Sequence, residues 1–318
     1  MWRHIIIRLA LCPVILWAIY TITFLMAVTI PGNPFKTSDR NLSPDVERAV
    51  MAIYKADDNW AFYWQYLDHL FQPVKAVRGE GPLIDLGPSW QYRDWTCNQI
   101  VAAALPVSVG LGMTAMLLAV VLGVPIGVIS AVKRNSWFDY TSLGLALIGI
   151  SLPTFVTGTA LLILFAVKLT WLPVGGWGSI SQLWLPAVTL SLPFMAYIAR
   201  LTRLGMLDVM ASDYIRTAQA KGLPPRTVIW KHALKNAFLP VLSYLGPASA
   251  AALTGSFIIE SIFNIPGLGQ HFVAGVLNRD RAMILGTVLV YSTVIVVFNL
   301  LVDLTYAVVD PRIDLEES

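Results

Sequence analysis

Residues 104–132 read ALPVSVGLGMTAMLLAVVLGVPIGVISAV and carry no charged side chain over 29 positions. An α-helix rises about 1.5 Å per residue, so about 20 apolar residues cross the hydrocarbon core of a bilayer. The cations Lys133 and Arg134 follow directly and end the apolar run. The segment therefore predicts a membrane-spanning helix.

Five more apolar runs have the same character, because each is long enough to span and none has a charged residue at its centre. They cover residues 9–30, 140–167, 183–199, 237–259 and 282–302. Only 13% of the residues are charged, whereas soluble domains carry about 25%. The sequence therefore predicts an all-α integral membrane protein with six transmembrane helices, and it excludes an ordinary soluble domain.

The chain divides by composition into four parts. Residues 1–30 form a first helix that is too long for the apolar core of a signal peptide and is followed by no A-x-A-like cleavage site. Residues 31–100 mix both charges with tryptophans and predict a small folded lobe, with a helix starting at Ser43–Asp45. Residues 101–310 hold the other five helices, and residues 311–318 form a tail.

Basic residues gather in the loop at residues 204–236 and just before it, between the fourth and fifth helices. Lysine and arginine in short loops favour the cytoplasmic side of the membrane. The basic residues of this region are Arg200, Arg203, Arg216, Lys221, Arg226, Lys231 and Lys235. Their distribution predicts that both termini are cytoplasmic and that the lobe at 31–100 lies outside.

Small residues recur in two of the predicted helices. Gly123 and Gly127 form a GxxxG pair, and residues 246–256 are rich in alanine, glycine and serine. Small side chains let helices approach closely in lipid. The pattern fits packing within one bundle and packing between subunits equally well.

The loop between the fourth and fifth helices has the pattern of two short helices around a glycine. Ser212 and Asp213 suit the start of a helix. Gly222 can take the positive φ that ends a helix, and Pro224-Pro225 prevents its continuation. Such a device suits docking of a soluble protein, or an amphipathic helix on anionic lipid, and the residues alone favour neither.

The segment RTAQAKG at residues 216–222, continued by HALK at 232–235, resembles the EAA loop of ABC importer permeases. Ala218, Gly222 and Leu234 stand at the alanine, glycine and leucine positions of that motif. Three other positions depart from the general motif in a way similar to the oligopeptide and dipeptide branch, namely Arg216, Thr217 and Lys235.

Other motifs resemble the same branch over nearly the whole chain. They are IPGNPF at 30–35, DLGPS at 85–89, FNIPGLG at 263–269 and VDPR at 309–312. The pattern is most similar to the first of the two permeases of that branch. Residues 71–82 look like an insertion in the outer lobe.

The resemblance implies a permease subunit of an importer in the bacterial inner membrane. Such a subunit is not an enzyme and binds no cofactor, because ATP and Mg²⁺ are held by two partner ATPases. The other implied partners are a second homologous permease, an extracytoplasmic binding protein, the lipid bilayer and a peptide substrate, with no nucleic acid. The implied ATPase-docking residues are Asp213, Tyr214, Ile215, Arg216, Ala218, Ala220, Lys221, Gly222, Leu223 and Leu234.

The turn after the fifth predicted helix, with Phe263, Pro266 and Gly267, falls at the predicted outer end of the protein. It suits an outer gate, but proline and glycine also simply end helices. Both interpretations stay open.

Two alternative functions stay open as well. One is an importer of the same kind for nickel or another small solute. The other is an ion-coupled carrier, a class that buries ionisable residues at mid-membrane. Here four such residues fall near predicted helix ends, where snorkelling or interfacial anchoring explains them: Asp139, Lys168, Glu260 and Asp303. The sequence has no HExxH, GxSxG or Walker A pattern, so we expect no metal site and no catalytic residue.

Overall fold

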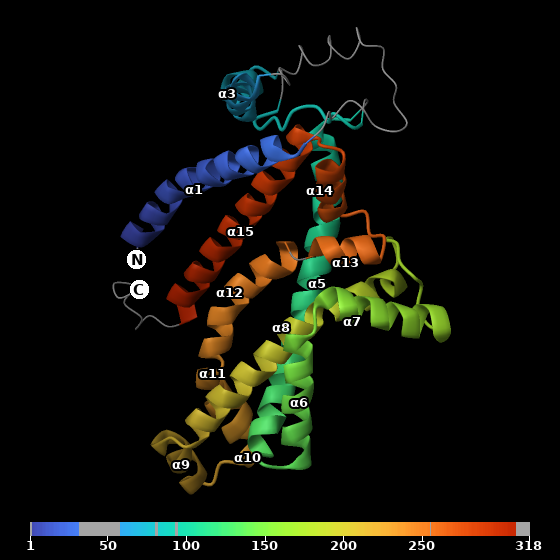
Figure 1. Cartoon of the computed structure of the whole chain (residues 1–318). Helices are drawn as coiled ribbons and strands as arrows, with labels where there is room; N and C mark the ends of the chain where they lie inside the picture. Colours follow the sequence, from blue (N-terminus) through green and yellow to red (C-terminus); the bar gives the residue numbers. More distant parts are fainter. Residues whose placement is uncertain (1, 32–57, 80–81, 93–94, 255, 310–318) are drawn as a thin grey trace. The chain divides into compact units, whose positions relative to one another are not determined.

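The structure, a computed structural model, describes residues 2–31, 58–79, 82–92, 95–254 and 256–309 (Figure 1). Within these residues every regular element is a helix, apart from two isolated bridges. The predicted all-α class is confirmed. The helices are α1 (Trp2–Thr29), α3 (Asn59–Leu70), α4 (Pro73–Val77), α5 (Cys97–Val132), α6 (Trp137–Ser151), α7 (Thr154–Leu161), η1 (Leu162–Lys168), α8 (Ile180–Met210), α9 (Asp213–Ala220), α10 (Pro225–Thr227), η2 (Val228–Ala233), α11 (Leu234–Ala237), α12 (Leu239–Thr254), α13 (Ser256–Ile262), α14 (Leu268–Leu277) and α15 (Arg281–Val309).

Five helical stretches of the described chain are long and apolar enough to cross a membrane, and a bent pair would add a sixth. The bent pair replaces the single predicted helix at 140–167. Its two arms, α6 and α7–η1, meet at an angle of 108°. Leu152 is extended because it precedes Pro153, and a residue before proline is disfavoured in the helical region. The apolar run predicted one helix because its hydropathy is uninterrupted, whereas Pro153 separates it into two helices.

The fourth predicted span is longer than its apolar run. α8 covers 31 residues, a length of about 46 Å that exceeds the roughly 30 Å hydrocarbon core. A helix of this length that spans the membrane therefore extends beyond the core at one end or at both. Residues 204–210, which the sequence placed in a loop, belong to this helix.

The chain forms two compact units. One contains Ser108–Ile265 and the residues from Val297 onward, and thus most of α5 and the helices from α6 to α13. The other contains Trp2–Val107 and Pro266–Val296, and thus α1, α3, α4, the start of α5, α14 and the first half of α15.

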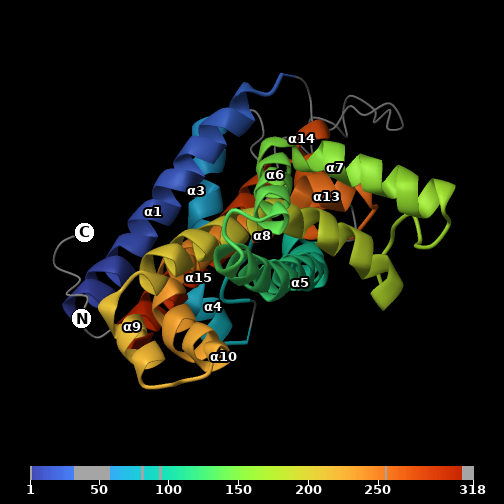
Figure 2. The ribbon, with the colours of Figure 1, turned by 90° about the horizontal axis from the view of Figure 1, so that it is seen from below.

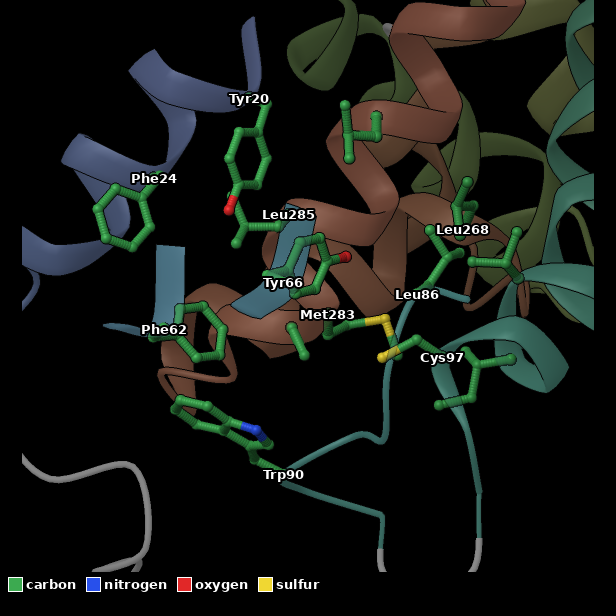
Figure 3. Packing of buried hydrophobic residues seen from close by; sticks show 14 of the residues in the cluster. Tyr20, Phe24, Phe62, Tyr66, Leu86, Trp90, Cys97, Leu268, Met283 and Leu285 are labelled. Carbon is green, nitrogen blue, oxygen red and sulfur yellow. The ribbon is translucent and has the colours of Figure 1, made fainter. Parts of the chain in front are cut away.

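The second of these units is built on an aromatic core (Figure 3). The ring of Tyr20 from α1 stacks on that of Tyr66 from α3 at 5.7 Å between centroids, and Phe24 stacks on Phe62 at 6.3 Å. The Tyr20 hydroxyl also donates to the backbone carbonyl of Tyr63 at 2.8 Å. This core fixes the described part of the predicted lobe on α1. The helix start predicted at Ser43–Asp45 lies outside the described residues.

A buried carboxylate organises the DLGPS segment in the same unit. Asp280, which is 1% exposed, accepts hydrogen bonds from the Ser89 hydroxyl at 2.7 Å and from the backbone N–H groups of Trp90, Gln91 and Met283 at 2.8–3.1 Å. Burial raises the pKa of the Asp280 carboxyl, and these hydrogen bonds oppose that shift. Asp280 thus holds the turn after the DLGPS motif on the start of α15.

The GxxxG pair lies where α5 crosses α8 in the other unit. A side chain at Gly123 would come within 2.8 Å of the Met195 carbonyl, and one at Gly127 would collide with the Ala199 carbonyl. Both glycines are therefore needed for close helix contact inside this chain. The structure assigns them to internal packing, which decides between the two readings that the sequence left open.

Candidate functional site

The predicted helix between the fourth and fifth spans is present as α9, at the end of α8 (Figures 1 and 2). Ser212 occupies the predicted N-cap position with an extended backbone. Its hydroxyl, however, donates to the Val209 carbonyl at 2.6 Å and makes no cap hydrogen bond to α9. Ser212 thus closes the end of α8 as well as separating the two helices. Asp213 stands in the first turn of α9, where its charge suits the helix dipole.

One face of α9 points into the protein. Ile215 is fully buried and Ala218 is 8% exposed, and both belong to an apolar cluster that also includes Val228 and Ala233. Their spacing of three residues puts them on the same side of the helix. These two predicted docking residues therefore anchor α9 to the bundle, and their side chains are not presented at the surface.

The opposite face of α9 is exposed. The predicted docking residues on it, and on the turn that follows, are Asp213, Tyr214, Arg216, Ala220, Lys221, Gly222 and Leu223. Asp213 and Arg216 lie 3.3 Å apart as an exposed ion pair, a kind that stabilises little. This surface combines both charges with a half-exposed tyrosine ring.

Gly222 ends the α9 segment as predicted. Its φ is +75°, a conformation that favours glycine. Its N–H donates to the Gln219 carbonyl at 2.9 Å, and the Leu223 N–H donates to the Ala218 carbonyl at 3.3 Å. A side chain at Gly222 would meet no atom within 4 Å, so only the backbone conformation restricts this position.

The second predicted helix is continuous from α10 through η2 to α11. Val228, Ala233 and Ala237 are buried in the same apolar cluster as Ile215, and Leu234 packs against it while half-buried. Asn236 donates through Nδ2 to the Tyr214 hydroxyl at 2.9 Å, which ties α11 to α9. The two helices and the glycine turn therefore form one packed device, which we call the α9–α11 hairpin (Asp213–Ala237).

Two features of this region are absent from the prediction. Trp230 is 44% exposed on the hairpin, and an aromatic ring in a basic segment is a signal that could have included it. The second feature is an ion pair between Asp139 and Arg203, with Nε–Oδ1 at 2.6 Å and Nη2–Oδ2 at 2.8 Å. These residues are 64 positions apart, so no local pattern indicates their contact.

Asp139 is 1% exposed and also accepts hydrogen bonds from the Ser130 hydroxyl at 2.5 Å and the Asn135 N–H at 2.9 Å. The expected snorkelling of Asp139 is therefore wrong. The α5–α6 turn positions this carboxylate so that it takes both nitrogens of one arginine edge. The pair fixes α8 ten residues before α9 begins, and so supports the base of the hairpin.

Glu260 also departs from the snorkelling expectation. It is fully buried in α13, and the Ser108 hydroxyl donates to its Oε1 at 2.7 Å. Lys168 is exposed at the end of η1, as expected for an interfacial lysine. The side chain of Asp303 lies outside the described part of the chain.

The three predicted gate residues fall in two different compact units. Phe263 is fully buried, with its ring against Gly158 of α7, and its carbonyl accepts from the Gly176 N–H at 2.9 Å. A side chain at the neighbouring Gly175 would collide with that carbonyl. Pro266 is exposed and Gly267 is buried, and both belong to the other compact unit. Phe263 thus packs the 172–178 turn on α13, and the gate stays a prediction.

Within the described residues, no group of three or more histidine, cysteine, aspartate or glutamate side chains could hold a metal ion.

Comparison with known proteins identifies the family. Residues 123–315 match the model of the binding-protein-dependent transport system inner membrane component. The chain is 45% identical over 300 residues to the oligopeptide transport system permease OppB of Salmonella typhimurium, covering 94% of each protein. It is 41% identical to the dipeptide transport system permease DppB of Bacillus subtilis over the whole of both chains.

A solved chain of the MetNI methionine ABC transporter, in an inward-facing conformation, matches 66% of this chain and 96% of its own length. The TM-score is 0.56 at 18% sequence identity, which is evidence of a shared fold alone. The resemblance inferred from the EAA-like loop and the other motifs is confirmed. This chain belongs to the family of binding-protein-dependent transport system inner membrane components.

Proposed function

We propose that the chain is the transmembrane permease subunit of an ATP-binding-cassette importer that moves oligopeptides or dipeptides across the bacterial inner membrane. The similarity to OppB and DppB permeases over 94–100% of the chain supports the transport reaction and the substrate class. The α9–α11 hairpin supports coupling to a separate ATPase, because it combines a buried anchoring face with an exposed one. The chain itself would hydrolyse nothing and bind no cofactor; ATP and Mg²⁺ would sit on the partners.

The proposed assembly has two permeases, two ATPases and an extracytoplasmic binding protein. The N- and C-termini and the hairpin would face the cytoplasm, and the lobe at 31–100 would face the binding protein. The exposed docking residues would lie against an ATPase subunit, and Ile215 and Ala218 would transmit its movement into the bundle. ATP binding can shift access only by as much as its affinity differs between the inward- and outward-open states.

Three structural elements suit the hairpin to that role. The apolar cluster around Ile215 makes α9 and α11 move together. The Asn236–Tyr214 hydrogen bond joins their exposed ends. The Asp139–Arg203 pair ties α8, which leads into the hairpin, to the α5–α6 turn. A displacement of α9 would therefore be transmitted through these contacts to α11, α8 and the α5–α6 turn.

An ion-coupled carrier is the second candidate, because Glu260 is fully buried in the candidate span Leu239–Ile262. Intramembrane carboxylates often mark ion pathways. Asp139, in contrast, is poorly suited to releasing and binding protons because two arginine nitrogens and two further donors hold it.

Uptake of a labelled oligopeptide into reconstituted vesicles distinguishes the ABC importer from the ion-coupled carrier. We expect uptake that requires ATP, both ATPases and the binding protein, and that does not respond to an imposed proton or sodium gradient. A Glu260→Gln variant should then retain ATP dependence. Gradient-driven uptake without ATPases, abolished by Glu260→Gln, would reject the importer. If the binding protein stimulates ATP hydrolysis but no peptide is taken up, the assignment as an ABC importer would stand and the peptide substrate would be rejected.

A further inference from the structure

We propose that the open faces of α8 and α12 line an aqueous pathway and that the rings of Tyr197 and Tyr244 contact the peptide that passes through it. This inference rests on the proposed function and names the residues that would meet the substrate. Both helices belong to the same compact unit, and they pack against each other (Figure 1).

The composition of these two helices favours water on one side of them. Among the candidate spans of the described residues, Ile180–Met210 and Leu239–Ile262 have the lowest mean hydropathy. The first is α8 and the second contains α12. A helix that borders an aqueous pore accepts polar groups that lipid disfavours. The more apolar spans, such as α5, are better suited to the lipid side.

The exposed residues of both helices follow a helical period. On α12 they recur every three or four positions, and on α8 the same spacing continues toward the hairpin. The repeating exposed positions are Pro240, Ser243 and Pro247 on α12, and Tyr197, Arg200 and Leu204 on α8. Each set therefore lies on one face of its helix. The face of α12 carries a serine between two prolines, and the face of α8 carries a tyrosine and an arginine, so neither is a purely apolar, lipid-facing stripe.

One tyrosine from α8 contacts one from α12 where the two exposed faces meet. The rings of Tyr197 and Tyr244 lie 4.3 Å apart between centroids, with 34° between their planes. Tyr197 is 38% exposed and Tyr244 is half-buried at the edge of the open face of α12. Aromatic rings offer an apolar surface to side chains of many kinds, and each phenol can donate and accept a hydrogen bond. The pair therefore suits a peptide of variable sequence.

A proline lies beside each tyrosine on its helix. Pro193 precedes Tyr197 by four residues, and Pro247 follows Tyr244 by three. Because proline has no N–H, Pro247 cannot donate to the carbonyl of Ser243, which lies on the open face. A carbonyl that has lost its helical donor can accept from a peptide N–H. Such a contact recognises peptide backbone regardless of side chains, as a pathway for mixed peptides requires.

Thiol labelling tests the pathway without depending on the substrate. In a Cys12→Ala, Cys97→Ala background, Ser243→Cys in the reconstituted complex should react with a membrane-impermeant thiol reagent. Leu117→Cys is the matched control, because Leu117 is 63% exposed on the apolar α5 and should react only with a lipid-soluble reagent. No reaction of Ser243→Cys with the impermeant reagent would overturn the pathway. Crosslinking of this cysteine to the second permease in place of labelling would assign the face to a subunit interface and overturn it equally.

Uptake kinetics test the peptide contact. Tyr197→Ala with Tyr244→Ala should raise the KM for a neutral tripeptide about 3- to 10-fold, which is the range expected for losing an aromatic contact. ATP hydrolysis stimulated by the binding protein should stay within twofold of the unmodified complex. The phenylalanine variants keep the rings and should change KM less. Tyr140→Ala, at a tyrosine that is 64% exposed on α6, is the control.

An alanine double variant with the KM of the Tyr140→Ala control would overturn the tyrosine contact while leaving the importer intact. If the unmodified complex takes up no peptide at all, the proposed function and the peptide contact both fail. The thiol labelling would still decide whether the two faces line water.

Discussion

Gly222 lies between α9 and α10, where the backbone conformation limits which residues are tolerated and the available space does not. Its φ is +75°, and a side chain there would meet no atom within 4 Å. Asp139 has the opposite character, because its backbone is ordinary and its side chain is fully committed to Arg203, Ser130 and Asn135. These two residues show the two ways in which single positions support the hairpin.

Gly222→Ala should lower the free energy of unfolding by about 1 kcal/mol, because an L side chain is disfavoured at positive φ. Gly144→Ala on α6 is the matched control, since a side chain there would also meet no atom within 4 Å but φ is not positive. Unfolding monitored in mild detergent measures both. An equal loss in the two variants would mean that the conformation of Gly222 contributes nothing.

Asp139→Asn should destabilise the protein strongly, by about 3 kcal/mol or more, because it leaves the charge of Arg203 without its buried partner. The exposed Asp213–Arg216 pair provides the comparison, and Asp213→Asn should lower the free energy of unfolding by about 1 kcal/mol or less. Joint replacement of Asp139 and Arg203 by leucine should recover part of the loss. If Asp139→Asn unfolds like the unmodified protein, the pair does not anchor α8.

At the level of elements, local patterns predicted α9, the glycine turn and the second helix well, because caps and proline act within a few residues. The break at Pro153 was also present in the sequence, but an uninterrupted apolar run concealed it. Contacts between distant segments gave no such signal. The Asp139–Arg203 pair joins residues 64 positions apart, and Glu260 meets Ser108 across 152 positions. Which residues of α9 face inward depended on how the hairpin packs on the bundle.

The two faces of α9 predict different reactivities. Ala220→Cys should crosslink to the ATPase in the assembled complex, because Ala220 is exposed, whereas Ala218→Cys should not, because Ala218 is 8% exposed. A bifunctional thiol reagent followed by gel analysis measures this. Labelling of Ala220→Cys by a lipid-soluble probe alone would instead favour a helix lying on the membrane surface.

Asp280→Ala should loosen the turn after the DLGPS motif, since it removes the acceptor of four hydrogen bonds. Loss of an acceptor for a buried donor costs about 1–3 kcal/mol. Ser89→Ala removes one of these four bonds and the two that the Ser89 hydroxyl accepts from the Gln91 and Tyr92 N–H groups. It leaves the carboxylate with its three backbone donors, so it should cost less than Asp280→Ala. Proteolysis between residues 82 and 95 and the unfolding midpoint report the difference. Equal behaviour of both variants would mean that Asp280 does not hold this turn.

For the whole molecule, the family assignment and the all-α membrane architecture follow from features spread along the chain, so they were predictable from the sequence. The GxxxG pair was not decisive, because the same glycines suit contacts within and between chains until their neighbours on α8 are known. In the proposed function, single residues fix the hairpin, and the hairpin fixes the end of α8. Because α8 borders the proposed pathway, an ATPase that moves the hairpin would change access to that pathway.

The coupling of ATP hydrolysis to uptake in a Gly222→Pro variant tests this claim most directly. Proline cannot adopt the φ of this position and lacks the N–H that donates to the Gln219 carbonyl. Reconstituted complexes with the unmodified chain, with Gly222→Pro and with the control Gly144→Ala would be compared for peptide taken up per ATP hydrolysed. We predict that Gly222→Pro assembles but loses uptake, while Gly144→Ala keeps the unmodified ratio. Normal uptake per ATP in an assembled Gly222→Pro complex would contradict the account.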